Sequence, residues 1–158
     1  MALPTQSDSG PAGRLAGIDF GTVRIGIAIT DIEQRLASPL ENYTRRGEAA
    51  DANHFRRLAD AEQVDRFIVG LPVHTSGDES AKSLEARRFG EWLGRVTGRP
   101  IEFFDERYTT SEAEQLLLGV KLTKKQRKAR LDKLAAQILL TAYLESRSRG
   151  ERPRSLDD

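Results

Sequence analysis

The hydrophobic and polar positions predict three strands in the first third of the chain. Residues 14–21 (RLAGIDFG) and 25–31 (IGIAITD) are short apolar runs, and the short turn between them is typical of an antiparallel hairpin. A third strand is predicted over 35–44, where Pro39 favours an edge position or a bulge because proline donates no backbone hydrogen bond. The chain therefore opens with an antiparallel three-stranded unit.

The rest of the pattern alternates between the helical period and short apolar runs. Helices are predicted, to within a residue or two, over 48–63, 80–97, 111–118 and 130–148. Strands are predicted over 66–72 and 101–107, the first a nearly continuous apolar run as expected of a buried parallel strand. This order predicts an α/β fold, a mixed five-stranded sheet flanked by helices.

The domain organisation follows from the same pattern. Residues 14–149 are expected to form one domain, because neither an internal repeat nor an interdomain linker interrupts them. Residues 1–13 and 150–158 are rich in small, polar and turn-forming residues and are expected to be disordered tails. The first of these tails lacks the apolar run of a signal peptide, and no segment approaches the roughly 20 apolar residues of a membrane span. We expect no membrane partner.

Composition restricts the chemistry of any metal site. The chain has no cysteine, which fits a reducing cytoplasm, and its two histidines, His54 and His74, have no zinc-ligand spacing. A bound metal would therefore be held mostly by oxygen, which favours Mg²⁺, Mn²⁺ or Ca²⁺.

Positive charge is concentrated in one segment. The formal net charge is only +1, so global charge gives no case for nucleic-acid binding. Residues 121–133, however, contain Asp132 as their sole acid among many basic residues, which is the electrostatic signature of a site for a polyanion. A solvated helix face or a flexible linker would have the same composition. The basic residues are Lys121, Lys124, Lys125, Arg127, Lys128, Arg130 and Lys133.

Two acidic residues interrupt or end predicted strands. Asp19 lies in an otherwise apolar strand, where a lone buried carboxylate is costly unless a cation or the following turn compensates it. Glu106 lies near the end of the strand over 101–107, where sheet proteins place ligand-binding groups. Because side chains alternate along a strand, only one of Asp105 and Glu106 is expected to share a site with Asp19. Strand-end charges that face solvent are the simpler alternative.

Asp132 is the third candidate acid. It is predicted in the first turn of the last helix, where the helix dipole alone would favour a carboxylate. The small residues Ala135 and Ala136 lie beside it on the helix surface and would let the helix approach the sheet. Three converging carboxylates could hold two cations roughly 3.5–4 Å apart and clamp a phosphodiester for attack by water, without a covalent intermediate.

Four motifs together resemble the YqgF/RuvX family of Holliday-junction-resolvase-like proteins. They are GIDFGTVRIGIA (17–28), IVGLP with Gly77 following (68–77), FDERYTTSEAE (104–114) and LDKLAAQILLTAYL (131–144). Members are regarded as candidate nucleases that mature the 5′ end of pre-16S ribosomal RNA. The resemblance implies an RNase H-like fold, Mg²⁺ or Mn²⁺, a cytoplasmic location and a role in ribosome biogenesis. It carries the catalytic and metal-binding acids onto Asp19, Glu106 and Asp132.

The resemblance also bears on substrate contacts. Arg24 matches the first motif and is expected to contact phosphate. The sequence departs from the family at Tyr108, where leucine is usual, and at His74, in a loop that more often carries Asn or Met. Neither departure removes an expected ligand. The residues expected to bind nucleic acid are Arg24, Arg107, Lys121, Lys124, Lys125, Arg127 and Lys128.

Two other functions remain open at this point. DFGT in a first hairpin also resembles the phosphate-binding turn of actin-like ATPases, but those proteins resemble a duplicated version of this fold, and the sequence has neither a P-loop nor GxGxxG. A non-catalytic RNA-binding ribosome-assembly factor on a nuclease fold is the other. The sequence does not choose between precursor rRNA and branched DNA, or between a monomer and a homodimer, although symmetric cleavage of a junction would favour a dimer.

Overall fold

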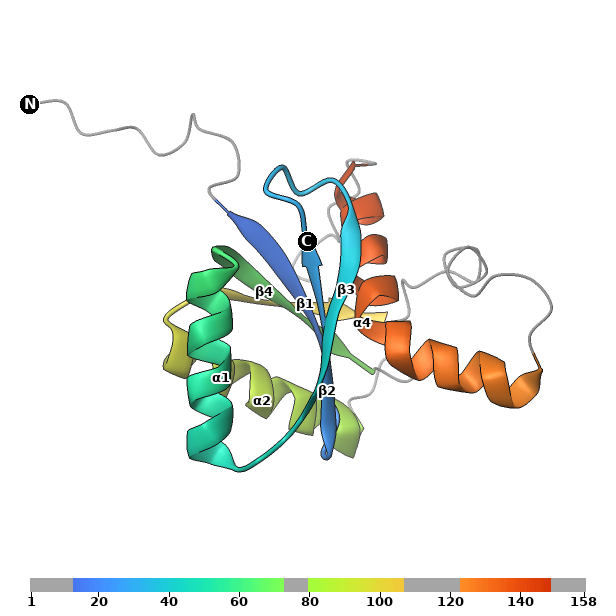
Figure 1. The fold of residues 1–158 in the computed structure, drawn as a ribbon, viewed down its shortest axis with the longest axis horizontal. Coiled ribbons are helices and arrows are strands. Elements are labelled where there is room, and N and C mark those ends of the chain that lie inside the picture. The colour runs from blue at the N-terminus through green and yellow to red at the C-terminus, as the bar shows by residue number, and fades with distance from the viewer. Residues whose placement is uncertain (1–12, 73–79, 107–122, 149–158) are drawn as a thin grey trace, which may run out of the picture.

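A computed structural model describes residues 13–72, 80–106 and 123–148 (Figure 1). Within the last range, the side chains of 127–133 are outside the description. The element labels follow Figure 1. The elements in chain order are β1 (Arg14–Asp19), β2 (Arg24–Thr30), β3 (Ala37–Thr44), α1 (Glu48–Ala61), β4 (Val64–Leu71), α2 (Ala81–Thr97), β5 (Ile101–Asp105) and α4 (Lys124–Ser148).

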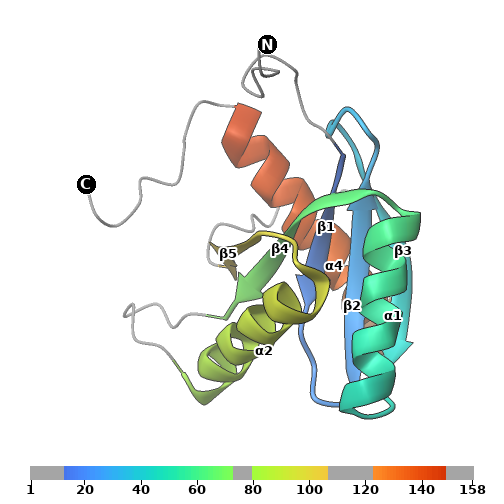
Figure 2. The ribbon, with the colours of Figure 1, turned by 90° about the vertical axis from the view of Figure 1, so that its left-hand side faces the viewer.

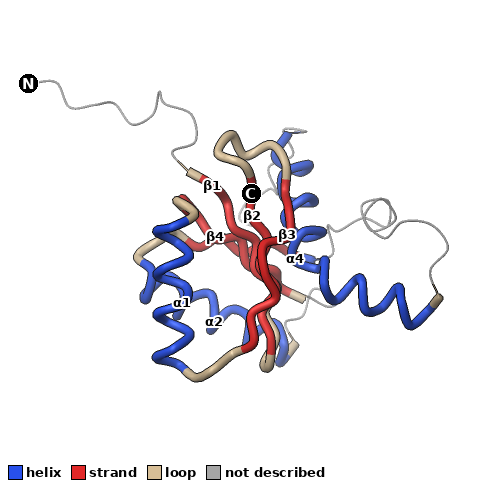
Figure 3. The backbone as a smooth tube through the Cα atoms, viewed as in Figure 1, coloured by secondary structure: helices blue, strands red, loops and turns tan. Residues whose placement is uncertain are grey.

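The strands form the predicted mixed five-stranded sheet, in the order β3-β2-β1-β4-β5 (Figure 3). β2 runs antiparallel to β1 and β3, whereas β4 runs parallel to β1 and β5. Pro39 lies in the edge strand β3, and the register shifts there, because Ala28 pairs with Pro39 while Ile27 pairs with Glu41. Both structural options that Pro39 favoured are therefore realised together.

Helices cover the two faces of the sheet. α1 and α2 pack on one face and α4 on the other, as the two views in Figures 1 and 2 show. Because side chains alternate along each strand, each face contributes to its own core. The buried residues on the α1/α2 side include Ile18, Ile25, Phe55, Phe67, Val69 and Leu93. Those on the α4 side include Leu15, Ala28, Ile68, Phe104, Leu139 and Leu140.

The last helix begins earlier than predicted, at Lys124 rather than near Arg130. The backbone N–H of Gln126 donates to Thr123 Oγ1 (3.2 Å) and that of Thr123 donates to Gln126 Oε1 (3.1 Å), a capping box that starts the helix. The placement of Asp132 in a first helical turn was therefore wrong, since it lies more than two turns inside α4. Figure 1 shows α4 bent, with its first part directed away from the sheet and its second part packed against it.

Small residues let α4 approach the sheet closely, as the alanines of its sequence predicted. Ala136 is buried, and a Cβ at Gly26 of β2 would lie 3.5 Å from the Ala136 Cβ. A Cβ at Gly17 of β1 would lie 3.0 Å from the Leu140 Cβ and 3.1 Å from the Ala136 carbonyl oxygen. Gly17 therefore has no room for a larger side chain unless the helix moves.

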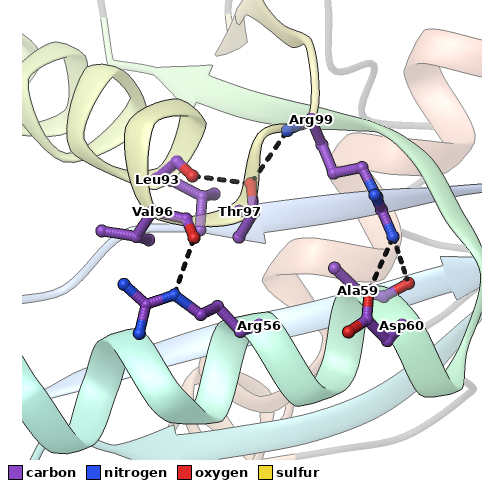
Figure 4. Close-up of polar contacts among 7 residues, drawn as sticks. All are labelled: Arg56, Ala59, Asp60, Leu93, Val96, Thr97 and Arg99. Carbon is purple, nitrogen blue, oxygen red and sulfur yellow. Dashed lines mark hydrogen bonds and ion pairs between the residues drawn. The ribbon is translucent and has the colours of Figure 1, made fainter.

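The C-terminal parts of α1 and α2 are tied together by two arginines (Figure 4). Arg56 Nε donates to the Val96 carbonyl oxygen (2.9 Å), and the Arg99 guanidinium donates to Asp60 Oδ1 (3.0 Å) and to the Ala59 carbonyl oxygen (3.3 Å). α2 ends where predicted, at Gly98 in the left-handed region (φ 70°). These contacts hold the C-terminal end of α2 against α1.

The predicted helix over 111–118 falls outside the described residues, as does the last residue of the predicted strand over 101–107. Among the helices that the structure describes, none has the length and apolar character that a bilayer span requires.

Candidate functional site

A cavity of about 340 Å³ opens where β1, β4 and β5 reach their carboxyl ends. Its wall includes Asp19 at the carboxyl end of β1, Glu106 just after β5, Gly70 of β4, and Lys82 and Glu85 of α2. The carboxyl ends of parallel strands are where α/β sheets place ligand-binding groups. We call this hollow the acidic cavity.

Strand alternation explains why two acids meet there. In β1, Leu15 belongs to the core under α4, so Asp19, four residues later, lies on the same face of the sheet. Phe104 of β5 also belongs to that core, and Glu106 follows it by two residues. Of the two adjacent acids at the end of β5, the structure brings Glu106 to the cavity with Asp19, and Asp105 is not part of its wall.

The two carboxylates differ in how closely they approach a glycine. A Cβ at Gly70 would lie 2.7 Å from Glu106 Oε1, closer than real Cβ contacts allow, so a larger residue here would require the Glu106 carboxylate to shift. A Cβ at Gly26 would lie 3.9 Å from Asp19 Oδ2, and Gly26 pairs with Asp19 across β1 and β2. The two carboxylates thus lie over the backbone of neighbouring strands.

The electrostatic setting of Glu106 is unfavourable for an anion. Burial, together with the negative charges of Asp19 and Asp105, raises the pKa of Glu106 from the usual 4.5 to about 7. A divalent cation between Asp19 and Glu106 would supply the opposite charge, and carboxylate oxygens are the ligands that Mg²⁺ and Mn²⁺ prefer. The residues present therefore fit such an ion.

The described residues supply part of the predicted ligand set. They contain no group of three or more His, Cys, Asp or Glu side chains arranged to hold a metal. Asp19 and Glu106 are brought together, whereas the side chain of Asp132, the third predicted ligand, lies outside the described part of α4.

The predicted nucleic-acid contacts are only partly within the described structure. Arg24 is exposed at the first position of β2, just after the turn residues Gly21 and Thr22 that line the acidic cavity. Lys124 and Lys125 are exposed in the first turn of α4. The remaining predictions fall on Arg107 and Lys121, outside the described residues, and on Arg127 and Lys128, whose side chains are not described.

Sequence reasoning missed the contribution of α2 to the cavity. Ser80 caps this helix by accepting a hydrogen bond from the Ser83 backbone N–H (3.1 Å), and Lys82 and Glu85 in the following turns line the cavity. The available signal was the strand-loop-helix order after β4, which places a helix N-terminus beside the carboxyl end of the preceding parallel strand.

This strand order, with two acids at the carboxyl end of the sheet, defines an RNase H-like fold of the RuvC type. RuvC of Thermus thermophilus has this fold, both in a complex with a Holliday junction (TM-score 0.54, 12% identity, 88% of this chain and 97% of that chain) and alone (TM-score 0.52, 13% identity, 87% and 97%). At such identities the likeness is one of fold.

The chain belongs to the RuvX family, described as Holliday junction resolvases, whose model matches residues 13–146. A relative from Rhodopirellula baltica is 48% identical over 149 residues, which cover 93% of this chain and 86% of the relative. A relative from Syntrophomonas wolfei is 36% identical over 138 residues, 87% of this chain and 98% of the relative. Both bear the name "Putative pre-16S rRNA nuclease".

Proposed function

We propose that the protein is a metal-dependent nuclease that hydrolyses a phosphodiester bond at the acidic cavity, and that it matures the 5′ end of pre-16S rRNA in the cytoplasm. The observation that carries the proposal is the pairing of Asp19 and Glu106 in one cavity at the carboxyl end of the sheet. The substrate is proposed from the name that the relatives bear, "Putative pre-16S rRNA nuclease".

The chemistry assigns different tasks to the parts of the cavity. Asp19 and Glu106 would hold Mg²⁺ or Mn²⁺, with Asp132 proposed as a third ligand, and the ion would supply Lewis-acid activation of water and of the phosphate. Asp19 is fixed by the ladder of β1, which has neighbours on both sides, so its carboxylate is held on a rigid element. Lys82, at the cavity wall, is placed to attract a phosphate oxygen.

The overall reaction is a hydrolysis. Water forms a new P–O bond, the bond from phosphorus to the departing oxygen breaks, and that oxygen takes up a proton. We propose that Arg24, Lys124 and Lys125, together with Arg107, Lys121, Arg127 and Lys128, hold the polyanionic strand through its phosphates. Such contacts release counterions, so binding should weaken steeply with salt and depend little on sequence.

Branched DNA is the second candidate substrate, favoured by the family description and by the RuvC-type fold. A four-way junction has two equivalent scissile bonds, and symmetric cleavage requires two active sites. This function would therefore need a homodimer, whereas trimming an rRNA end needs only a monomer.

The test compares wild type with Asp19→Asn on end-labelled precursor rRNA and on a four-way DNA junction, in Mg²⁺, Mn²⁺ or EDTA. We expect wild type to shorten the rRNA 5′ end only when metal is present, and Asp19→Asn to bind the RNA without cleaving it. Cleavage that survives in Asp19→Asn or in EDTA would refute the proposed site. RNA binding without cleavage by wild type would favour an assembly factor, and paired cuts in the junction would favour the second substrate.

A further inference from the structure

A second hollow adjoins the acidic cavity. It has a volume of about 410 Å³ and shares the lining residues Phe20, Thr22 and Glu85 with the acidic cavity, so the two hollows are direct neighbours. On its far side lie Arg45, just beyond β3, and Arg88 and Trp92 of α2. We call this hollow the aromatic groove. A nucleic-acid strand with a phosphate bound at Asp19 and Glu106 would have to run along the aromatic groove or turn away from it.

The groove is built on aromatic side chains. The ring centroids of Phe20 and Phe89 are 4.9 Å apart, and those of Phe89 and Trp92 are 5.4 Å apart. Phe89 is buried, but Phe20 and Trp92 are only partly covered and contribute surface to the groove. The Arg45 guanidinium lies 5.4 Å from the centre of the Phe20 ring and 5.9 Å from that of Phe89. Flat apolar surface with a guanidinium above it is the kind of platform on which bases stack.

The charges around the groove oppose a simple phosphate site. Arg45 and Arg88 line the groove together with Glu48 and Glu85, so the four lining charges cancel formally. Arg45 is in addition paired with the buried Asp51, with Nε 3.3 Å from Oδ2. A phosphate would meet two carboxylates here, whereas a base edge carries both donors and acceptors and can use both kinds of lining group.

We propose that the aromatic groove binds one unpaired base of the substrate strand, next to the phosphate that is cleaved. The placement of the strand rests on the proposed function, since it assumes a phosphate at the acidic cavity. A base can enter only if it is unstacked and unpaired, so the groove selects a single-stranded segment over a duplex at this position. Stacking provides affinity without a strict sequence preference.

Trp92 makes the proposal directly measurable, because it is the only tryptophan of the chain. Asp19→Asn protein in EDTA is titrated with a short single-stranded RNA, so that no cleavage occurs, while Trp92 fluorescence and the anisotropy of the labelled RNA are recorded together. We expect saturable quenching that follows the anisotropy. The same sequence in a duplex should not quench, and an RNA lacking one base at the critical position should bind without quenching.

Arg88 and Arg95 provide a matched pair of variants. Both arginines are exposed on α2, so neither substitution threatens the fold. Only Arg88 lines the groove. In the Asp19→Asn background, Arg88→Ala should weaken RNA binding about fivefold at low salt, and Arg95→Ala should not. Trp92→Leu keeps an apolar side chain but removes the stacking surface, and anisotropy should show roughly tenfold weaker binding.

The outcomes separate this inference from the proposed function. Three results would each contradict base binding in the groove. They are saturation of the anisotropy without quenching, equal RNA binding by the Arg88→Ala and Arg95→Ala variants, and full quenching by RNA without bases. In each case, metal-dependent cleavage by wild type would still support the proposed nuclease function. Conversely, quenching that depends on the base and on Arg88, in a protein that never cleaves, would support the groove and remove the nuclease proposal.

Discussion

Two acids of this molecule, the buried Asp51 and the half-buried Glu106, lie in opposite electrostatic settings. Asp51 is 1% exposed at the start of α1. It accepts hydrogen bonds from the Tyr43 hydroxyl (2.6 Å), the Arg46 backbone N–H (2.9 Å) and Arg45 Nε (3.3 Å). Burial alone would raise the pKa of Asp51, but these hydrogen bonds hold it below the usual 3.8.

Glu106 has the reverse arrangement, since burial and the charges of Asp19 and Asp105 raise its pKa to about 7. The fold satisfies the charge of Asp51 with its own donors and places the charge of Glu106 beside other carboxylates. The comparison teaches that a buried acid is structural where the chain supplies its partners. Where the chain supplies like charges instead, a bound cation is the natural compensation.

The largest contrast should appear in catalysis. Glu106→Gln keeps the shape of the side chain but removes a proposed metal ligand, so we expect metal-dependent cleavage to fall about a thousandfold. Asp51→Asn, assayed well below its melting temperature, should stay within about threefold of wild type, because Asp51 does not line the acidic cavity. Single-turnover rates on labelled precursor RNA measure both. Equal losses of cleavage in the two variants would contradict the distinction between a structural Asp51 and a catalytic Glu106.

For stability, Asp51→Asn is expected to have a larger effect than Glu106→Gln. Asp51→Asn leaves Arg45 without its anionic partner and weakens three hydrogen bonds, so we expect the free energy of unfolding to fall by about 3 kcal/mol. Asp60 is a matched control, since its side chain is 81% exposed and pairs with Arg99 at the surface. Asp60→Asn should cost less than about 1 kcal/mol. Urea denaturation followed by circular dichroism gives both values, and similar costs would contradict the role of Asp51.

The pH dependence of stability has a sign fixed by the lowered pKa of Asp51. The folded-state pKa lies below 3.8, so the stabilisation by Asp51 is present above the unfolded-state pKa and is lost as pH falls through the folded value. We expect this loss below about pH 4 in wild type, and a shallower acid limb in Asp51→Asn. Identical acid limbs would show that another group controls acid unfolding.

A smaller effect is expected from the glycine under Glu106. Gly70→Ala would place a Cβ 2.7 Å from Glu106 Oε1 and displace the carboxylate, so cleavage should fall roughly tenfold. Gly26→Ala is the control, because its Cβ would make ordinary contacts of 3.5 Å with Ala136 and Asp19. It should change cleavage by less than about threefold. Kinetics at saturating metal test the pair, and a Gly70→Ala enzyme as active as Gly26→Ala would contradict the geometry.

The smallest expected effect is a gain in stability. Without metal at pH 8, the ionised Glu106 disfavours the folded state, because an acid with a raised folded-state pKa loses stability as pH rises through it. Glu106→Gln should therefore raise the free energy of unfolding by about 1 kcal/mol at pH 8 and change little at pH 4.5. Thermal melts in EDTA at both values check this, and destabilisation at pH 8 would show that Glu106 has a stabilising partner.

Much of this architecture was predictable, because the local residue preferences and the strand alternation agree with the fold. Asp19 stood out as a polar break in an apolar strand, Pro39 indicated an edge strand, and alternation separated Asp105 from Glu106. The start of α4 was missed because the Thr123–Gln126 capping box precedes a run of basic residues that has no apolar stripe. The positions of Lys82 and of the aromatic groove depend on how α2 packs against α1, β4 and β5, which the local sequence pattern does not determine.

Metal binding tests the central claim most directly. Isothermal titration of Mn²⁺ into wild type, Asp19→Asn, Glu106→Gln and Asp105→Asn compares two proposed ligands with the neighbouring acid outside the cavity. We predict a saturable site in wild type and in Asp105→Asn, and affinity at least roughly tenfold weaker in the other two variants. Equal Mn²⁺ affinity in all four proteins would contradict the account.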